Sequence, residues 1–134
     1  MELNRVPPHD IQAEQAVLGS MLLDKDAVIS SIEVLREDSF YREDNRAVFA
    51  AMLSLYSKSE PIDLITVKNE LTENGNFERI GGLEFLASLP EKVPTTSNVD
   101  RYIKIVEEYA MRRNLIQTSN DLIALRIWWF WGNR

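Results

Sequence analysis

Apolar residues recur three and four positions apart along most of the chain, which is the period of an α-helix with one buried face. The pattern predicts a first helix over about 11–23, after a start signal at Asp10. Gly19 stands in the middle of this helix and indicates that another backbone crosses closely there. A second helix follows, with Asp24 or Asp26 as its capping residue.

Three further helices are predicted in the next part of the chain. One covers about 43–57, and we interpret its apolar stripe as the centre of the core. A fourth begins after Asp63 and stops at Gly75. A short fifth segment follows the turn at Gly81 and Gly82 and is terminated by Pro90 and Pro94. The stripe of the 43–57 helix consists of Val48, Phe49, Met52, Leu53 and Tyr56.

From Thr95 the chain contains no Gly or Pro until Gly132, which predicts one long helix, and Ser97 with Asp100 resembles a capping box at its start. Its apolar residues do not keep to one face, so the helix requires a second partner, either a returning helix or another chain. No strand-like alternation appears, and we therefore expect an all-α fold. The residues off the main stripe are Ile105, Leu115 and Leu122.

The last nine residues, 126–134, differ in composition from the rest, because all three Trp lie here beside Phe130. Two interpretations are open: a real aromatic anchor, or a non-native ending from a shifted reading frame. We favour the second.

The amino-acid composition disfavours or excludes several classes of function. Fifteen Lys and Arg against 21 Asp and Glu give a net charge of −6, which disfavours phosphate contacts, and we expect little direct DNA binding. The absence of Cys excludes disulfides and a thiolate zinc site. No apolar run is long enough to span a membrane and no signal-peptide core is present, so we expect a cytoplasmic protein without membrane contact.

The sequence lacks the residue patterns that common catalytic sites require. No Lys follows a Gly, which excludes a phosphate-binding Walker loop. The one His, His9, lies in a proline-containing arm, and we interpret it as solvated rather than as a metal ligand or a catalytic base. We therefore expect no enzyme activity and no catalytic, cofactor-binding or metal-binding residues.

Five stretches, in order, resemble the amino-terminal domain of the bacterial replicative DNA helicase of the DnaB type. The resemblance covers about residues 5–122, and within it Asn45 stands where the family often has His. The stretches are RVPPHDIQAEQAVLGSMLL at 5–23, FYREDNRAVFAAM at 40–52, PIDLITVKNEL at 61–71, GGLEFLASL at 81–89 and VPTTSNVDRYIKIVEEYAMRRNLI at 93–116.

The resemblance implies a compact helical head followed by a helical hairpin. We divide the chain into an extended arm (1–10), the head (11–92), the first hairpin helix (95–125) and a non-native tail (126–134). Where the family continues with a polar and acidic segment, this chain has IALRIWWFWGNR, so we expect an incomplete hairpin whose single helix dimerises.

In the family, heads and hairpins pair between subunits into a collar, a trimer of dimers on a hexameric ring. The collar docks the carboxy-terminal helicase-binding domain of primase and affects the helicase loader. ATP and Mg²⁺ belong to the carboxy-terminal motor domain, which is absent here, so no cofactor is expected in this fragment.

Candidate partner-binding residues follow from the resemblance. We assign Phe85, Ile116 and Leu122 as apolar anchors for primase or a neighbouring subunit, and Arg112 and Arg113 as the polar rim. Core packing of Phe85 and intrachain burial of the other two anchors are the alternatives. Two other functions stay open: a stand-alone adaptor or loader-like protein, which requires a genuine Trp tail, and a helical DNA-binding domain, which requires a basic recognition helix.

Overall fold

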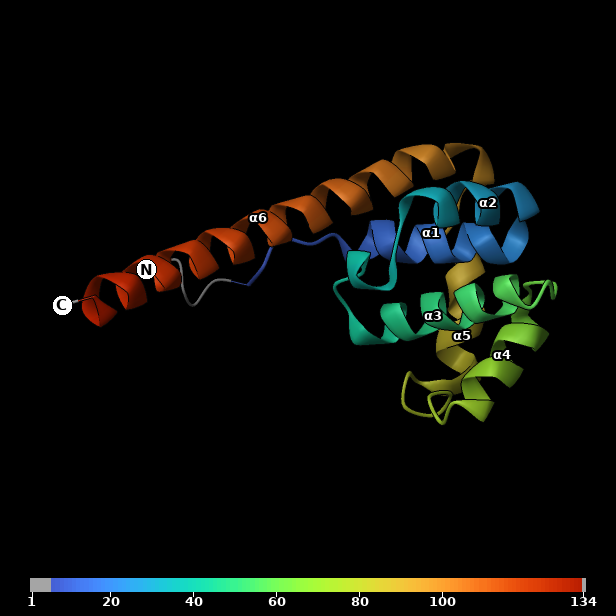
Figure 1. The fold of residues 1–134 in the computed structure, drawn as a ribbon. Helices are drawn as coiled ribbons and strands as arrows, with labels where there is room; N and C mark the ends of the chain where they lie inside the picture. The colour runs from blue at the N-terminus through green and yellow to red at the C-terminus, as the bar shows by residue number, and fades with distance from the viewer. Residues whose placement is uncertain (1–5, 134) are drawn as a thin grey trace.

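The computed structural model describes residues 6–133, and over this range it is all-α, with no strand. Helices α1 to α5 form a head, and α6 runs across the head and continues well beyond it (Figure 1). The elements are α1 (Ile11–Leu23), α2 (Lys25–Val34), η2 (Glu37–Ser39), α3 (Glu43–Ser57), α4 (Leu64–Glu73), α5 (Gly82–Glu91), η3 (Thr96–Asn98) and α6 (Val99–Gly132). The predicted fold class is confirmed.

The centre of the head is α1, and the prediction that the 43–57 helix occupies this place is wrong. Every residue of α1 from Ala13 to Met21 is buried, because α2, α3, α5 and α6 all pack around it. A helix buried on all sides has no polar face, so its sequence shows little of the amphipathic period that marks α3.

Gly19 provides the close approach that the sequence predicts, and the neighbour is the end of α5. A Cβ atom at Gly19 would lie 2.6 Å from Val93 Cγ2 and 2.8 Å from the carbonyl carbon of Leu89, and it would overlap the Leu89 carbonyl oxygen. Only a residue without a side chain allows the two backbones to pass at this distance.

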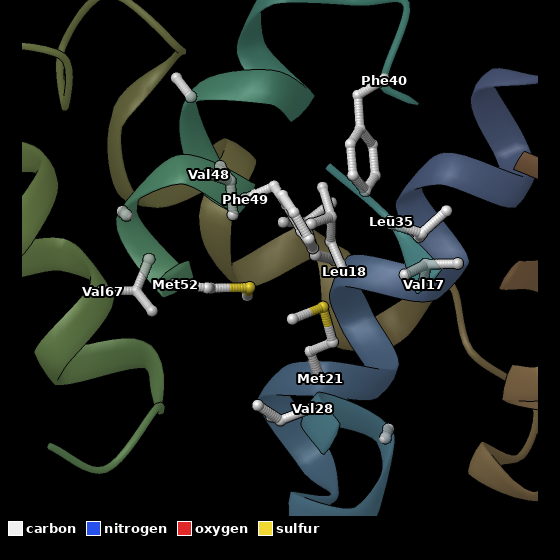
Figure 2. Close-up of a cluster of buried hydrophobic side chains, with 14 of the residues drawn as sticks. Val17, Leu18, Met21, Val28, Leu35, Phe40, Val48, Phe49, Met52 and Val67 are labelled. Carbon is white, nitrogen blue, oxygen red and sulfur yellow. The ribbon is translucent and has the colours of Figure 1, made fainter. Parts of the chain in front are cut away.

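The core side chains labelled in Figure 2 come from α1, α2, α3 and α4 and from the segments between α2 and α3, and α5 and α6 complete the same cluster with Leu86, Leu89, Val99, Ile103 and Val106. Phe40 and Phe49 are fully buried, with ring centroids 4.7 Å apart. Val48 and Met52 are buried as predicted, whereas Tyr56 is 48% exposed because it lies at the rim of the head.

Three of the predicted helix starts are confirmed by hydrogen bonds to the capping carboxylate. Asp10 accepts the amide of Ala13, Asp24 accepts the amide of Asp26, and Asp63 accepts the amides of the first turn of α4. Each cap satisfies backbone donors that a helix leaves unpaired at its start.

The predicted end of α5 is confirmed, and one predicted boundary at the start of α6 is wrong. Helix α5 continues through Pro90 and ends at Glu91, before Pro94. The capping box of Ser97 and Asp100 does not form, and the Thr95 hydroxyl instead accepts the Ser97 amide at the start of η3.

Helix α6 passes without interruption through the compositional change at residue 126 and ends at Gly132. Its buried residues all lie near its start: Val99, Ile103 and Val106. The interpretation of 126–134 as a non-native tail stays a prediction.

Candidate interaction surface

Beyond Arg113, α6 has no contact that buries it. Every described residue from 114 to 133 is exposed, and we call this range the distal segment. Figure 1 shows it extending away from the head. Apolar side chains that are between 50% and 69% exposed occupy much of it, namely Leu115, Ile116, Leu122, Ile123, Leu125, Ile127, Trp128, Trp129, Phe130 and Trp131. Such exposure over one element is typical of a surface that binds another macromolecule.

These residues fall mainly on two neighbouring strips of the helix, since each residue advances about 100° around the axis. The first, which we call the seam, begins at Met111, just before the distal segment, and consists of Met111, Leu115, Thr118, Leu122, Leu125 and Trp129. The second, which we call the flank, consists of Ile116, Ile123 and Phe130.

Arg113 lies between α6 and the head, and sequence analysis missed its structural contacts. Its guanidinium donates to the carbonyl of Pro8 (3.0 Å) and to the carbonyl of Ser39 (2.8 Å), and it lies 5.7 Å from the centre of the Tyr41 ring. Burial lowers the pKa of Arg113, while the charge of Glu14 raises it. The side chain therefore fixes the base of the distal segment to the arm and to η2.

Glu14 is the buried acceptor next to this junction. Its carboxylate accepts the Tyr41 amide (2.7 Å), the Arg42 amide (3.4 Å) and the Asn45 side-chain amide (2.9 Å). Charged acceptors stabilise buried donors strongly, so Glu14 holds the loop before α3 onto α1. A glutamate in the first turn of a helix that contains no other charged residue is the sequence signal that could have identified it.

His9 is partly exposed, as the interpretation as a solvated residue expects, but it also contacts the head. Its ring stacks on Tyr41 at 4.1 Å, with an interplanar angle of 11°, and its Nδ1 donates to the carbonyl of Pro7 (2.7 Å). Residues 8–10 of the predicted arm therefore contact the folded helices, while residues 1–5 lie outside the described residues.

The five predicted partner-binding residues lie in two separate places. Phe85 is half-buried against the core of the head. Arg112 lies over the Tyr109 ring at 4.8 Å, next to the engaged Arg113. Ile116 and Leu122 are 50% and 61% exposed, so the alternative of intrachain burial is wrong for both.

The head also has an apolar groove of about 710 Å³ where the α1–α2 turn meets the loop after α3. Leu23, Ile29 and Tyr56 line it and are partly exposed.

Residues 6–133 contain no group of three or more His, Cys, Asp or Glu residues that could hold a metal ion. Within the same range no helix is both long and apolar enough to cross a membrane.

Comparisons with a family model and with known relatives identify the same family. Residues 6–108 match the model of the family described as DnaB-like helicase N terminal domain. The chain is 50% identical to the replicative DNA helicase DnaB of Leifsonia xyli and 43% identical to that of Geobacillus stearothermophilus, over 90% and 88% of its length. It spans only 26% of each of these two relatives.

A solved structure is also similar. The crystal structure of the N-terminal domain of DnaB helicase from Mycobacterium tuberculosis has a TM-score of 0.86 and 43% sequence identity, over 89% of this chain and 85% of that chain.

Proposed function

The chain belongs to the family of DnaB-like helicase N-terminal domains, and we propose that it is the non-catalytic collar domain of a hexameric replicative DNA helicase, which associates with other subunits and docks primase. One observation carries the proposal: the head buries a complete core, whereas the distal segment leaves its apolar residues exposed. A surface of this kind is built to be covered by a partner.

The remainder of the helicase, about three quarters of its length in the relatives, would bind ATP and Mg²⁺ and move DNA. The collar would act in the bacterial cytoplasm at the replication fork, and the helicase loader would act on the same assembly. The excess of acidic residues supports a role through protein contacts rather than through phosphate neutralisation.

Two surfaces of this chain are candidates for the primase-binding site. The flank offers Ile116 on the distal segment, with Arg112 one turn before it as a polar neighbour. Phe85 lies on the head, where its half-buried ring packs on the core. We assign Ile116 to the centre of the contact, because an exposed anchor gains more burial on binding than a residue that is already packed.

The test is a calorimetric titration of the chain with the carboxy-terminal helicase-binding domain of a bacterial primase. Saturable binding is expected, and Ile116→Asp should weaken it by about tenfold or more, because the substitution places a charge in an apolar contact. Asn114→Asp is the matched control, since Asn114 lies about 160° around the helix axis from Ile116 on the same exposed segment.

Absence of binding with a head that still melts cooperatively would contradict primase docking by this chain. Loss of the cooperative melt in Ile116→Asp would instead assign the residue to the fold. Tight, salt-sensitive binding of duplex DNA would favour the alternative of a helical DNA-binding domain.

A further inference from the structure

The last turn of α6 is apolar on every side. Residues 127–131, which we call the tip, have the sequence IWWFW, and all five side chains are between 50% and 69% exposed. Consecutive residues are about 100° apart around the axis, so the five side chains surround the helix and leave no polar face. Trp129 continues the seam and Phe130 the flank, whereas Trp128 and Trp131 lie on a third side.

This distribution favours a lipid surface over a folded protein as the occupant. A groove on a protein receives one apolar face of a helix, so it would leave part of the tip in water. A lipid–water interface deforms around an inserted helix and can contact all of its sides. Trp is the residue typical of that interface, because its ring is large and apolar while its indole N–H still donates to water or to a headgroup.

The charges of the chain indicate an anionic lipid surface. All 21 Asp and Glu lie before residue 122, and after it the charged side chains are Arg126 and Arg134. An acidic protein thus carries its aromatic cluster on a basic segment. Basic residues beside an apolar anchor are attracted to the negative surface of an anionic membrane.

The shape of the molecule keeps the acidic head away from that surface. Arg113 fixes α6 to the head, and Trp128 lies roughly 23 Å further along the helix axis. Figure 1 shows the helices of the head gathered at the other end of α6. The screening length is about 8 Å at physiological salt, so repulsion between the head and an anionic membrane is largely screened when the tip touches it.

The contact is with one surface of a bilayer. No helix within residues 6–133 is long and apolar enough to cross a membrane, and an interfacial segment does not need such a length. The expectation of no membrane contact rested on the absence of a long apolar run, and that criterion detects membrane-spanning segments rather than interfacial ones.

We propose that the tip binds the lipid–water interface of an anionic membrane, with its three Trp at the level of the headgroups, Arg126 beside the lipid phosphates and the head in water. The proposal goes beyond the proposed function and can fail independently of it, because primase docking is measured without lipid. It follows from side chains that the chain carries, so it does not depend on the origin of residues 126–134.

Intrinsic fluorescence tests the proposal, because all three Trp of the chain lie in the tip. The chain is titrated with vesicles made of equal parts of phosphatidylcholine and phosphatidylglycerol, and the excitation wavelength is one that Tyr does not absorb. The Trp emission should move to shorter wavelength and saturate as the rings leave water. The chain should also sediment with the vesicles.

Three variants show which residues make the contact. Ile127→Asp keeps every Trp but places a carboxylate in the tip, and it should weaken vesicle binding by about tenfold or more. Asn114→Asp adds the same charge near the head and is the matched control, which should bind within about twofold of wild type. Arg126→Gln should weaken binding to these vesicles by about fivefold and leave binding to pure phosphatidylcholine vesicles unchanged.

An unchanged emission and no sedimentation with vesicles, for a chain whose head is folded by circular dichroism, would overturn the proposal. Equal binding by wild type and Ile127→Asp would also overturn it, because the contact would then lie outside the tip. An emission that the primase domain shifts to shorter wavelength, and that vesicles do not shift, would identify a protein as the occupant instead of a lipid surface.

Discussion

The head and the distal segment carry similar apolar residues, but the head buries them and the distal segment exposes them. Leu18, Leu86 and Leu89 are fully buried in the head, whereas Leu115 and Leu122 on the distal segment are 65% and 61% exposed. Both regions are regular helix with helical apolar spacing. The difference is that four neighbouring helices surround α1, while no described residue outside α6 buries the distal segment. Apolar periodicity therefore identifies a face that is to be buried, but not whether the burial is within or between chains.

The largest expected effect comes from removing a leucine side chain in each region. Leu18→Ala should lower the free energy of unfolding by about 3–5 kcal/mol, because the cavity forms in a fully buried site. Leu115→Ala should leave the melt of the head unchanged and should weaken self-association instead. Chemical denaturation at low protein concentration, together with sedimentation at high concentration, separates the two effects.

If Leu115→Ala lowers the unfolding free energy of the dilute monomer by more than about 1 kcal/mol, the contrast between a buried head and an exposed distal segment is contradicted, since surface substitutions normally cost less. Such a result would mean that the distal segment folds back on its own head.

A smaller effect is expected from adding one methyl group at a glycine of each region. Gly19→Ala should destabilise the head by about 1–3 kcal/mol, because the new Cβ meets the backbone of Leu89, which cannot move away as a flexible side chain could. Gly132→Ala has no atom within 4 Å of its new Cβ and should be neutral or slightly stabilising. Thermal unfolding followed by circular dichroism measures both, and equal midpoints for the two variants would contradict the close crossing of α1 and α5.

Sequence alone predicts the helices and most of their starts, because capping and helix-breaking residues act locally. Asp10 and Asp63 cap as their positions indicate, and Gly75 follows α4 with a φ of +73°. Even the long-range crossing at Gly19 is predictable, since a glycine inside a helix is unfavourable unless a neighbour requires the space.

Sequence reasoning fails where the decisive contact is distant and polar. Arg113 bonds to carbonyls 105 and 74 positions away, and no local pattern distinguishes it from Arg112. The central place of α1 was missed for a related reason, since full burial removes the polar face that periodicity detects. Exposure of Ile116 and Leu122 likewise depends on what the chain packs against.

The head also contains a buried carboxylate for which the distal segment has no counterpart. Glu70 accepts the Ser54 hydroxyl (2.7 Å) and pairs with Lys58 Nζ (3.0 Å). The hydrogen bond from Ser54, and then the bond and charge of Lys58, lower the pKa of Glu70 from its ordinary value of 4.5. Because the folded state binds the proton less readily than the unfolded state, the ionised carboxylate stabilises the fold at pH values above 4.5.

The smallest expected effect follows from this pair. Protonation of Glu70 removes its contribution as the pH falls below 4.5, so wild type should lose more stability than Glu70→Gln between pH 7 and pH 3, and the two should converge at the acid end. Asp121→Asn, on the distal segment, is the matched control and should follow the acid dependence of the wild-type head. Urea unfolding at a series of pH values measures the three proteins. A constant difference between wild type and Glu70→Gln at every pH would show that packing, rather than charge, is what Glu70 contributes to the head.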